Sequence, residues 1–356
     1  MIIHADNFSM YGTNVNLMLN GIYAGVSGAS LVADPDGISP GYVFKADSNG
    51  SNSNTPWRYV FQTGNTDSAG VALRMWWPSL PTNNFARTKV IEFRSNANEA
   101  LAHLSLTSAG NIEVRILSDT DPYNETYFVT DFPVVTAQGW YHVELRYDSG
   151  VSAGFELRVE GVPVLSADGV LGNSAQIAQA ACYRQNISGD VAHFIKDLVI
   201  WTTEGTYNTD FLGTVLVTNL RPTADVSLNW APSTGTNGWS ILDNSPPDNA
   251  QYISAEDLPI PGAYVGELSN LPVEATSVKA LVTFVRAAKI DGGDGSLQAG
   301  LISSPASDPA TSLGANRPIT VAQTYWRDVF EIDPKTGAPW LPPAVNQAQL
   351  RINRTT

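Results

Sequence analysis

The chain has 356 residues, of which 43% are hydrophobic and 15% are charged, so it is long enough for two globular domains with full-sized cores. Its 20 basic and 34 acidic residues give a net charge of −14, and a surface field of this sign repels phosphate backbones and anionic membranes. We therefore expect no nucleic-acid partner and no membrane insertion, and the single cysteine, Cys182, excludes an internal disulfide.

The N-terminus reads MIIHADNFSM and contains no basic segment followed by an apolar stretch. No run of 18 apolar residues occurs anywhere in the chain. The sequence therefore predicts neither a Sec signal peptide nor a membrane-spanning helix. If the protein works outside a cell, we expect it to leave by another route, such as lysis.

Residues 1–211 consist mainly of short stretches of alternating polarity, separated by clusters of Gly, Asn, Asp and Pro. Examples are VALRMWW, TKVIEFRS, AHLSLTSAGNIEVRIL, YHVELRYD, FELRVEGVPVL and VAHFIKDLVIW. The pattern predicts many short antiparallel strands in a sandwich or jelly roll. Within FELRVEGVPVL, Glu160 and Gly161 predict a tight hairpin turn because Gly161 tolerates a positive φ. Pro163 then predicts an edge strand or a bulge.

A second series of strands begins after TYNTDFLG. It includes TVLVTNL, VSLNW, AYVGEL, SVKALVTFVRAAK, SLQAGLIS and AQLRIN, spaced by Pro-rich and Asp-rich turns. We therefore predict an all-β protein with a jelly roll over residues 1–211 and a smaller β-sandwich over residues 212–356. The second domain is expected to act as a docking or interaction domain.

The segment GWYHVELRYD, residues 139–148, places His142 close to Glu144. At the period of two that a strand imposes, Trp140, His142, Glu144 and Arg146 share one face. The pair has two interpretations, an acid–base pair or neighbours on a half-buried strand. No nucleophile and no His-x-x-x-His metal spacing accompanies it, so we predict that His142 is not catalytic.

A glycosidase needs two carboxyl groups about 5 to 9.5 Å apart, and Glu156 and Glu160 are the nearest such pattern on one strand. They are separated by roughly 13 Å along a strand at ~3.3 Å per residue. Arg158 lies between them, and Glu160 falls in the predicted turn. We predict a solvated strand face here and no catalytic residue.

Acidic turns offer oxygen ligands that could hold calcium. They are ADPDG with Asp34 and Asp36, DTDP with Asp119 and Asp121, and DGGDG with Asp291 and Asp294. None has the spacing of a complete calcium loop, and Asp–Gly runs are typical of plain turns. We predict no cofactor and no metal site, with calcium as the alternative.

The segment VALRMWWP suggests a ligand-binding surface. Val71, Leu73, Met75 and Trp77 share one face of the strand, which leaves Trp76 on the face of Arg74. A tryptophan that points outward next to an arginine can stack on a sugar ring or anchor a protein interface. Trp76 and Arg74 are therefore the predicted ligand-binding residues, with packing beneath a loop or the other domain as the alternative.

The first half of the chain resembles the concanavalin A-like, laminin-G-like jelly rolls. The similarity lies in GWYHVELRYD, the hairpin GFELRVEGVPVL and the closing strand FIKDLVIW, which contains Asp197. The resemblance implies a lectin-like sandwich in which the tryptophan–histidine strand is scaffold. The glucanases of that family carry an aspartate where this chain has Arg158.

The region around the domain junction resembles proteins of tailed bacteriophages and prophages that are encoded among virion genes. The similarity spans roughly residues 197–350 and includes LVIWTTEGTYNTDFLG and WRDVFEIDPKTGAPWLPPAVNQAQLRI. It implies a virion protein of the tail region, but it assigns no catalytic or binding residue.

From these resemblances we expect a non-enzymatic structural protein on the outer surface of the virion, of the tail-fibre, baseplate or adhesin type. It would act by binding other virion proteins or a host surface glycan. A homo-oligomer is expected, with a trimer as the first choice. Two alternatives are a capsid or tail decoration protein that only stabilises the particle and a virion-associated glycan depolymerase.

Overall fold

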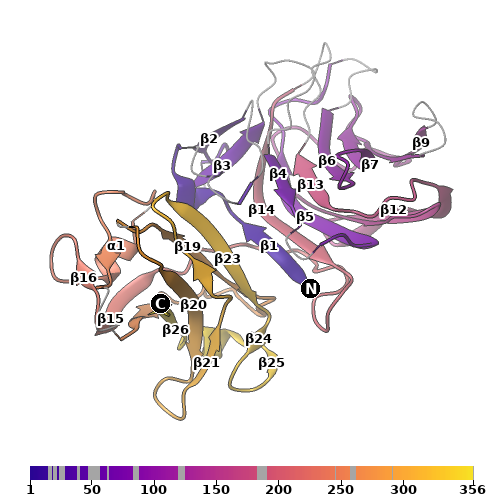
Figure 1. The fold of residues 1–356 in the computed structure, drawn as a ribbon. Helices are drawn as coiled ribbons and strands as arrows, with labels where there is room; N and C mark the ends of the chain where they lie inside the picture. Colours follow the sequence, from indigo (N-terminus) through magenta and orange to yellow (C-terminus); the bar gives the residue numbers. More distant parts are fainter. Residues whose placement is uncertain are drawn as a thin grey trace. The chain divides into compact units, whose positions relative to one another are not determined.

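The computed structural model describes residues 1–14, 18, 22–23, 29–37, 41–46, 57–61, 64–82, 88–118, 125–182, 191–244, 246–256, 262–290 and 292–355. Almost all of its regular structure is β-strand (Figure 1). The described helices are η1 (Ser9–Tyr11), α1 (Trp239–Leu242) and α2 (Pro342–Val345). The prediction of an all-β, sandwich-type fold is therefore confirmed. None of the described helices is long and apolar enough to span a membrane.

The chain forms two compact units. The first comprises Met1–Leu19 and Tyr23–Val217, and the second comprises Asn20–Ile22 and Thr218–Thr356. The division therefore lies C-terminal to the boundary that we predicted after residue 211. The reason is that backbone N–H groups between residues 212 and 217 donate hydrogen bonds to side chains of the first unit.

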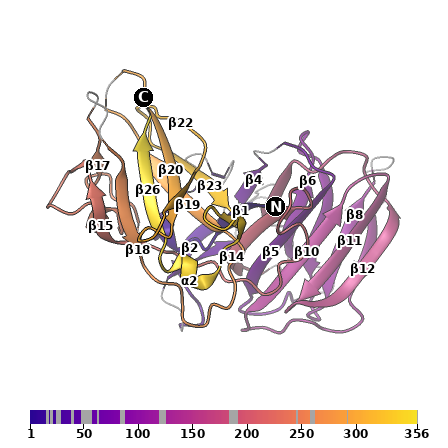
Figure 2. The ribbon, with the colours of Figure 1, turned by 90° about the horizontal axis from the view of Figure 1, so that it is seen from below.

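Two antiparallel sheets make up the first unit, and we call the larger one sheet A. In spatial order its strands are β12 (Val162–Leu171), β11 (Ser152–Val159), β10 (Tyr141–Asp148), β5 (Ser68–Trp76), β14 (His193–Thr202), β3 (Tyr42–Ala46) and β2 (Ala29–Ala33), while β1 (Ile2–Asp6) pairs with β14. The strands β5, β10, β11 and β12 lie side by side in Figure 2. The central strands of sheet A thus come from distant parts of the sequence.

Sheet B is the second layer. Its order is β4 (Trp57–Val60), β13 (Gln179–Cys182), β6 (Thr88–Arg94), β7 (Ala100–Leu106), β8 (Ile112–Leu117) and β9 (Glu125–Val129). From β6 to β9 the strands follow one another in sequence as well as in space. Side chains on these neighbouring strands are therefore directly opposite one another, about 4.5–5.5 Å apart at Cβ.

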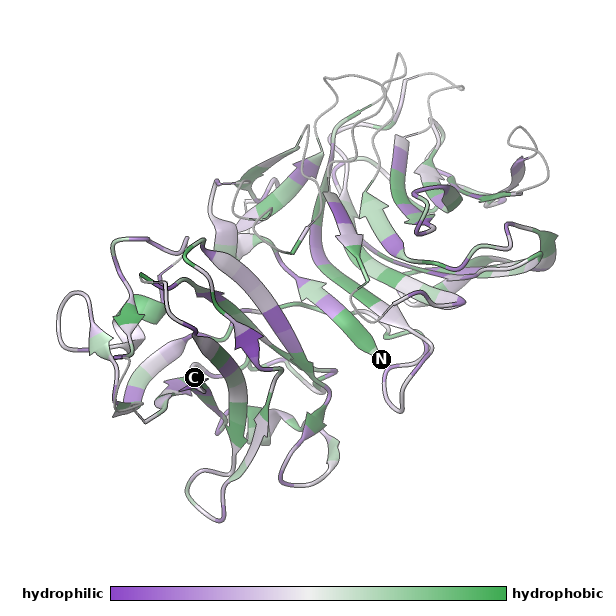
Figure 3. Ribbon diagram, viewed as in Figure 1, coloured by the Kyte–Doolittle hydropathy of each residue, from purple (hydrophilic) through white to green (hydrophobic). Residues whose placement is uncertain are grey.

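The core of the first unit lies between the two sheets. The Phe93 ring of sheet B stacks on the Tyr147 ring of sheet A at 5.8 Å, and Phe128 contacts Phe155 at 5.2 Å. Hydrophobic and hydrophilic residues alternate along many strands, as Figure 3 shows. Each sheet thus turns one face to the core and the other outward, which is the arrangement that the period-two patterns predicted.

The hairpin between β11 and β12 has the predicted turn. Glu160 has a φ of 49° and Gly161 a φ of 78°, so both central residues lie in the left-handed region that a two-residue hairpin turn requires. A register shift lies where Arg158 pairs with Pro163, at the edge of sheet A. The expectation of an edge or bulge at Pro163 is therefore confirmed.

The second unit contains a sheet, a two-stranded ribbon and two short strand pairs. The sheet runs β15 (Pro222–Leu228), β18 (Tyr264–Leu268), β26 (Gln349–Arg354), β20 (Ser296–Ser303) and β21 (Ala310–Leu313), with β22 (Arg317–Pro318) also paired to β20. The ribbon is formed by β19 (Leu281–Ala287) and β23 (Thr324–Phe330). The short pairs are β16 (Ala231–Pro232) with β17 (Ile253–Ser254) and β24 (Ile332–Asp333) with β25 (Ala338–Pro339).

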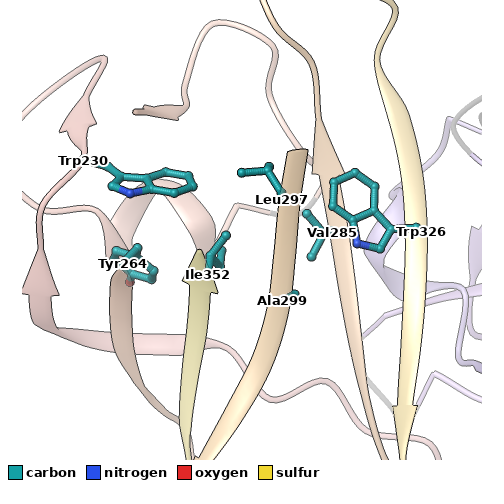
Figure 4. Packing of buried hydrophobic residues seen from close by; sticks show 7 residues of the cluster. All are labelled: Trp230, Tyr264, Val285, Leu297, Ala299, Trp326 and Ile352. Carbon is teal, nitrogen blue, oxygen red and sulfur yellow. The ribbon is translucent and has the colours of Figure 1, made fainter. Parts of the chain in front are cut away.

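A separate hydrophobic core holds the second unit together (Figure 4). Tyr264 and Ile352 come from the sheet, whereas Val285 and Trp326 come from opposite positions on the ribbon. Trp230 closes this core, and its indole N–H donates to the Gly262 carbonyl at 2.9 Å. The second unit is therefore stabilised by its own apolar contacts.

Candidate functional site: two polar sheet faces in the first unit

The outer face of sheet B carries a row of ionisable side chains across four neighbouring strands. Glu92 on β6 pairs with His103 on β7, which pairs with Arg115 on β8, which pairs with Tyr127 on β9. The sequence produces the row by alternation, because the residues on either side of Glu92 in the pattern, Ile91 and Phe93, are buried. We call Glu92, His103, Glu113 and Arg115 the sheet B cluster.

Three cations accompany the carboxylates of this face. Lys89 Nζ lies 3.7 Å and Arg94 Nε 2.5 Å from the Glu92 carboxylate. Arg115 Nε lies 2.6 Å from Glu113 Oε1, and the same guanidinium also forms an ion pair with Glu125. The carboxyl groups of Glu92, Glu113 and Glu125 thus share three cations, and Arg115 forms ion pairs with both Glu113 and Glu125.

Burial and crowding raise the pKa of the two central carboxyl groups. Glu113 is fully buried, and desolvation, with a smaller contribution from the neighbouring Glu125 carboxylate, raises its pKa to about 7. Desolvation also raises the pKa of Glu92, although Lys89 and Arg94 oppose this change. The Glu113 carboxyl group is therefore only partly ionised near neutral pH.

His103 differs from these carboxyl groups because it is held in its neutral form. Desolvation, together with the positive charge of Lys89, lowers the pKa of His103 well below 6.5. Its Nδ1 atom is buried and has no hydrogen-bond partner among the described residues. A neutral imidazole with a nitrogen of this kind can accept a proton.

An exposed aromatic ring lies at the end of the row. The Tyr127 side chain is 61% exposed, and the Arg115 guanidinium lies 5.9 Å from its ring centroid. Exposed tyrosine rings of this kind can stack on the apolar face of a sugar. Proton-transferring groups and a candidate sugar platform therefore share one sheet face.

The outer face of sheet A is polar as well, but a segment of the chain covers its centre. We call residues 211–217 the crossing segment. Leu212 N and Gly213 N donate to the two carboxylate oxygens of Glu144 at 2.8 and 3.1 Å, and Val215 N donates to His142 Nε2 at 3.4 Å. His142 and Glu144 are thus brought together on one strand face, as the sequence predicted, and both bind backbone.

Asp197 anchors the end of the crossing segment. Its Oδ1 accepts a hydrogen bond from Val217 N at 2.9 Å, and its Oδ2 lies 3.6 Å from Arg74 Nε. A positive φ of 54° and a bulge after Lys196 place this carboxylate on the outer face. Desolvation raises the pKa of Asp197 to about 6, whereas the Val217 hydrogen bond and the Arg74 charge lower it.

Burial keeps His142 neutral, which suits its role as an acceptor. Desolvation, assisted by the positive charge of Arg74, lowers the pKa of His142 to about 4. An imidazole nitrogen that accepts a backbone N–H must be unprotonated. His142 therefore holds the crossing segment on sheet A, and the prediction that it is not catalytic stays a prediction.

The predicted ligand-binding residues lie on the same outer face of sheet A. Trp76 is partly exposed while Trp77 is fully buried, so the two adjacent tryptophans point to opposite sides, as alternation predicted. The Arg74 side chain is 30% exposed. The structure places Trp76 and Arg74 on one face of sheet A.

The other residues considered from sequence have structural partners. Glu156 forms an ion pair with Arg158 at 2.7 Å, and the Glu160 carboxylate accepts a hydrogen bond from His142 N at 2.7 Å. Asp34 binds Lys196 Nζ at 2.7 Å and Trp140 Nε1 at 3.2 Å. Asp119, Asp121 and Asp291 lie outside the described residues. Within the described part of the chain, no group of three or more His, Cys, Asp or Glu side chains could hold a metal ion.

Sequence reasoning missed the sheet B cluster. It compared acidic residues along single strands, whereas Glu92 and Glu113 come from two strands with His103 on the strand between them. A signal was present in TKVIEFRS and NIEVRIL, because in both a glutamate stands directly between two apolar residues. Only the pairing of consecutive hairpins brings these glutamates onto one face.

Comparisons with known proteins give similarities of fold at low sequence identity. No family model matches the chain, and no curated protein matches it. An endo-β-1,4-glucuronan lyase from the fungus Trichoderma reesei has a TM-score of 0.41 and 8% identity, with 57% of this chain and 96% of that chain covered. The alginate lyase vAL-1 from Chlorella virus has a TM-score of 0.40 and 12% identity, covering 56% of this chain and 99% of that one.

Receptor-binding domains of toxins are also among the similar structures. The receptor-binding domain of botulinum neurotoxin mosaic serotype C/D has a TM-score of 0.36 and 14% identity over 50% of this chain and 43% of that chain. At such TM-scores the likeness assigns neither activity nor ligand to this chain.

The prediction that the chain is not an enzyme is wrong on these comparisons, in which three of the similar structures are polysaccharide lyases. The prediction also rested on strands considered one at a time, and it therefore overlooked the paired carboxyl groups and the neutral histidine of sheet B.

Proposed function

We propose that the chain is a glycan depolymerase of a tailed-phage particle and that the outer face of sheet B is its reactive surface. The single observation that carries this proposal is the sheet B cluster, in which a carboxyl group with a pKa of about 7 and a neutral histidine lie on adjacent strands. Groups whose pKa values are displaced in opposite directions are typical of general acid–base sites.

Glu113 and His103 of the cluster have distinct tasks in this proposal, and Tyr127 beside the cluster has a third. Glu113 donates a proton to the oxygen of the glycosidic bond that breaks, because it retains that proton near neutral pH. His103 accepts through Nδ1, which has no partner among the described residues, the proton that leaves the attacking water in a hydrolysis or a sugar ring carbon in an elimination. The exposed ring of Tyr127 provides the platform on which a sugar stacks.

Substrate access requires movement of the long cationic side chains on this face. His103 and Glu113 are almost completely buried, whereas the side chains of Lys89, Arg94 and Arg115 are 15–21% exposed. A bound glycan would displace one of these cationic side chains from the glutamate carboxylate with which it pairs. Lysine and arginine side chains have the rotamer freedom that such an exchange needs.

The location follows from the resemblance of residues 197–350 to virion proteins of tailed phages. A depolymerase on the outer surface of the virion would meet a host surface glycan directly. Other virion proteins would be its partners, and several copies in a ring or trimer would increase avidity for a repetitive glycan. Antibody labelling of purified intact particles tests this location, and the presence of the protein only in infected-cell lysate would contradict it.

The activity is tested by incubating the purified full-length chain with capsular and extracellular polysaccharides of candidate hosts and measuring new reducing ends. We expect cleavage of one glycan class, and a loss of about 10²-fold or more in rate for Glu113→Gln and for His103→Gln. A rise in ultraviolet absorbance would identify an unsaturated product and thus elimination, whereas reducing ends without it would identify hydrolysis.

Glu156→Gln is the matched control, because it changes an ion-paired glutamate on the outer face of sheet A. It should leave the rate unchanged. Wild-type rates in correctly folded Glu113→Gln and His103→Gln proteins would refute the assignment of the site. A wild-type chain that releases no reducing ends from any glycan of a host that the phage infects would refute the function.

A further inference from the structure

One end of the outer face of sheet A presents three aromatic residues in a row. Trp76 pairs with Phe194 on β14, and their ring centroids are 5.0 Å apart at an interplanar angle of 87°. Trp140 directly precedes β10 and so extends the row on the other side of Trp76, because Tyr141 pairs with Met75. All three aromatic side chains are partly exposed.

Two cations lie in the next row of the same face. Arg74 on β5 pairs with Lys196 on β14. Lys196 Nζ lies 4.1 Å from the centroid of the Trp140 ring and binds the Asp34 carboxylate. The cationic row and the aromatic row therefore form one continuous surface, which we call the aromatic–cationic row.

Arg74 is the cation with unused donors. Asp197 lies 3.6 Å from its Nε, but this atom has no hydrogen bond of acceptable geometry, and no described residue hydrogen-bonds the rest of the guanidinium. Its side chain is 30% exposed. Arg74 therefore presents a partly exposed guanidinium on the same face as Trp76 and next to the pair that Trp76 forms with Phe194.

We propose that the aromatic–cationic row binds an oligosaccharide that carries carboxylate groups, at a site separate from the sheet B cluster. Aromatic rings pack against the apolar C–H faces of sugars, and a guanidinium donates two parallel hydrogen bonds to a carboxylate. Trp76 supplies the central ring and Arg74 recognises the acid group. The site binds without chemistry, so it stands whether or not sheet B is catalytic.

The experiment measures binding to the full-length chain in the Glu113→Gln background, so that cleavage cannot consume the probe. The probes are an oligogalacturonate and the neutral cellohexaose, titrated by calorimetry. We expect the acidic probe to bind about tenfold more tightly than the neutral one, and Trp76→Ala to weaken both by about tenfold. Arg74→Gln should abolish the preference for the acidic probe and leave the neutral probe unaffected.

Matched controls come from outside the row. Phe132→Ala removes an aromatic side chain that is 61% exposed, and Arg58→Gln removes a partly exposed guanidinium on sheet B. Both should retain the affinity and the preference. Equal affinity of the Trp76→Ala and parent proteins, equal affinity for the two probes, or no binding of either probe would overturn the proposal. None of these results would affect the reducing-end assay for sheet B.

Discussion

The outer faces of sheets A and B contain the same kinds of side chain but give them different partners. On sheet A, His142 and Glu144 accept hydrogen bonds from the backbone of the crossing segment. On sheet B, Glu92 and Glu113 face arginine and lysine side chains instead of backbone. The Nδ1 atoms of His103 and His142 are both buried without a hydrogen-bond partner among the described residues, so the two histidines differ in the bond that Val215 N donates to His142 Nε2. A histidine and a glutamate therefore have structural roles on one face and the potential for chemistry on the other.

The difference shows that the partner, and not the residue type, distinguishes an anchor from an acid–base site. A backbone N–H cannot move away from its acceptor without displacing the chain, so Glu144 is fixed in place and covered. A side-chain cation can exchange for a ligand. Arg115 is shared by Glu113 and Glu125, and this crowding of carboxyl groups helps Glu113 to retain a proton.

The largest expected effect is on stability and comes from sheet A. Glu144→Ala would leave the N–H groups of Leu212 and Gly213 without their acceptors beneath the crossing segment. We expect the free energy of unfolding of the first unit to fall by about 2–5 kcal/mol, because each unsatisfied buried donor costs about 1–3 kcal/mol. Urea denaturation measures the change.

The loss of stability in Glu144→Ala is to be compared with that in Glu113→Gln, which changes a buried glutamate on sheet B. This substitution replaces a carboxyl group whose pKa is raised to about 7 with an uncharged amide of the same shape, so stability should change by less than about 1 kcal/mol. Equal losses of stability in the Glu144→Ala and Glu113→Gln proteins would show that the two faces do not differ in the way described.

The second prediction separates the two histidines by activity. His142→Ala and His103→Ala each remove a buried imidazole and should each cost about 0.5–3 kcal/mol of stability. Only His103→Ala should also abolish cleavage of a glycan substrate, because His142 Nε2 is occupied by Val215 N. Denaturation and reducing-end assays on the same samples decide this. Loss of activity in a folded His142→Ala protein would show that His142 takes part in the reaction.

The sequence was sufficient to predict what depends on local periodicity. It predicted the all-β fold, the opposite directions of Trp76 and Trp77, and the Glu160–Gly161 turn, because alternation and turn chemistry are properties of neighbouring residues. It could not predict the sheet B cluster. Glu92 and Glu113 become neighbours of His103 only through strand register, which depends on contacts between strands.

The crossing segment shows the same limit. Residues 211–217 contain no strand of the structure, and TYNTDFLG was interpreted as a domain boundary. Their position on sheet A depends on Glu144 and Asp197, which precede them by tens of residues. Nothing in the composition of a short Gly-containing segment indicates which distant carboxylates will bind its backbone.

The third prediction concerns pH and gives Glu113 of sheet B and His142 of sheet A opposite signs. The pKa of Glu113 is raised from 4.5 to about 7, so the folded state binds more protons than the unfolded state in this window and stability falls as pH rises through it. The pKa of His142 is lowered from 6.5 to about 4, so here the folded state binds fewer protons and stability falls as pH decreases through that window.

These signs are tested by measuring the denaturation midpoints of wild type, Glu113→Gln and His142→Gln between pH 4 and pH 8. After solvent screening, the free energy of unfolding should change by about 1 kcal/mol or less per pH unit relative to wild type. Relative to wild type, Glu113→Gln should gain stability as pH rises from 4.5 to 7. His142→Gln should instead gain, relative to wild type, as pH falls from 6.5 to 4. Curves that run parallel to wild type would mean that neither group titrates as described.

The smallest expected effect concerns Phe211, the first residue of the crossing segment. The Phe211 ring lies 3.9 Å below the Arg158 guanidinium and 5.4 Å from that of Arg146, and it contacts the edge of Trp201 at 5.8 Å. Phe211→Leu keeps an apolar side chain over Trp201 but removes the aromatic face, so unfolding should become easier by only about 0.5–1 kcal/mol. Because the Glu144 anchor remains, hydrogen exchange at Leu212 and Gly213 should stay slow in this variant, whereas it should become fast in Glu144→Ala. Fast exchange at both positions in Phe211→Leu would mean that the aromatic contact, and not the carboxylate, holds the segment on sheet A.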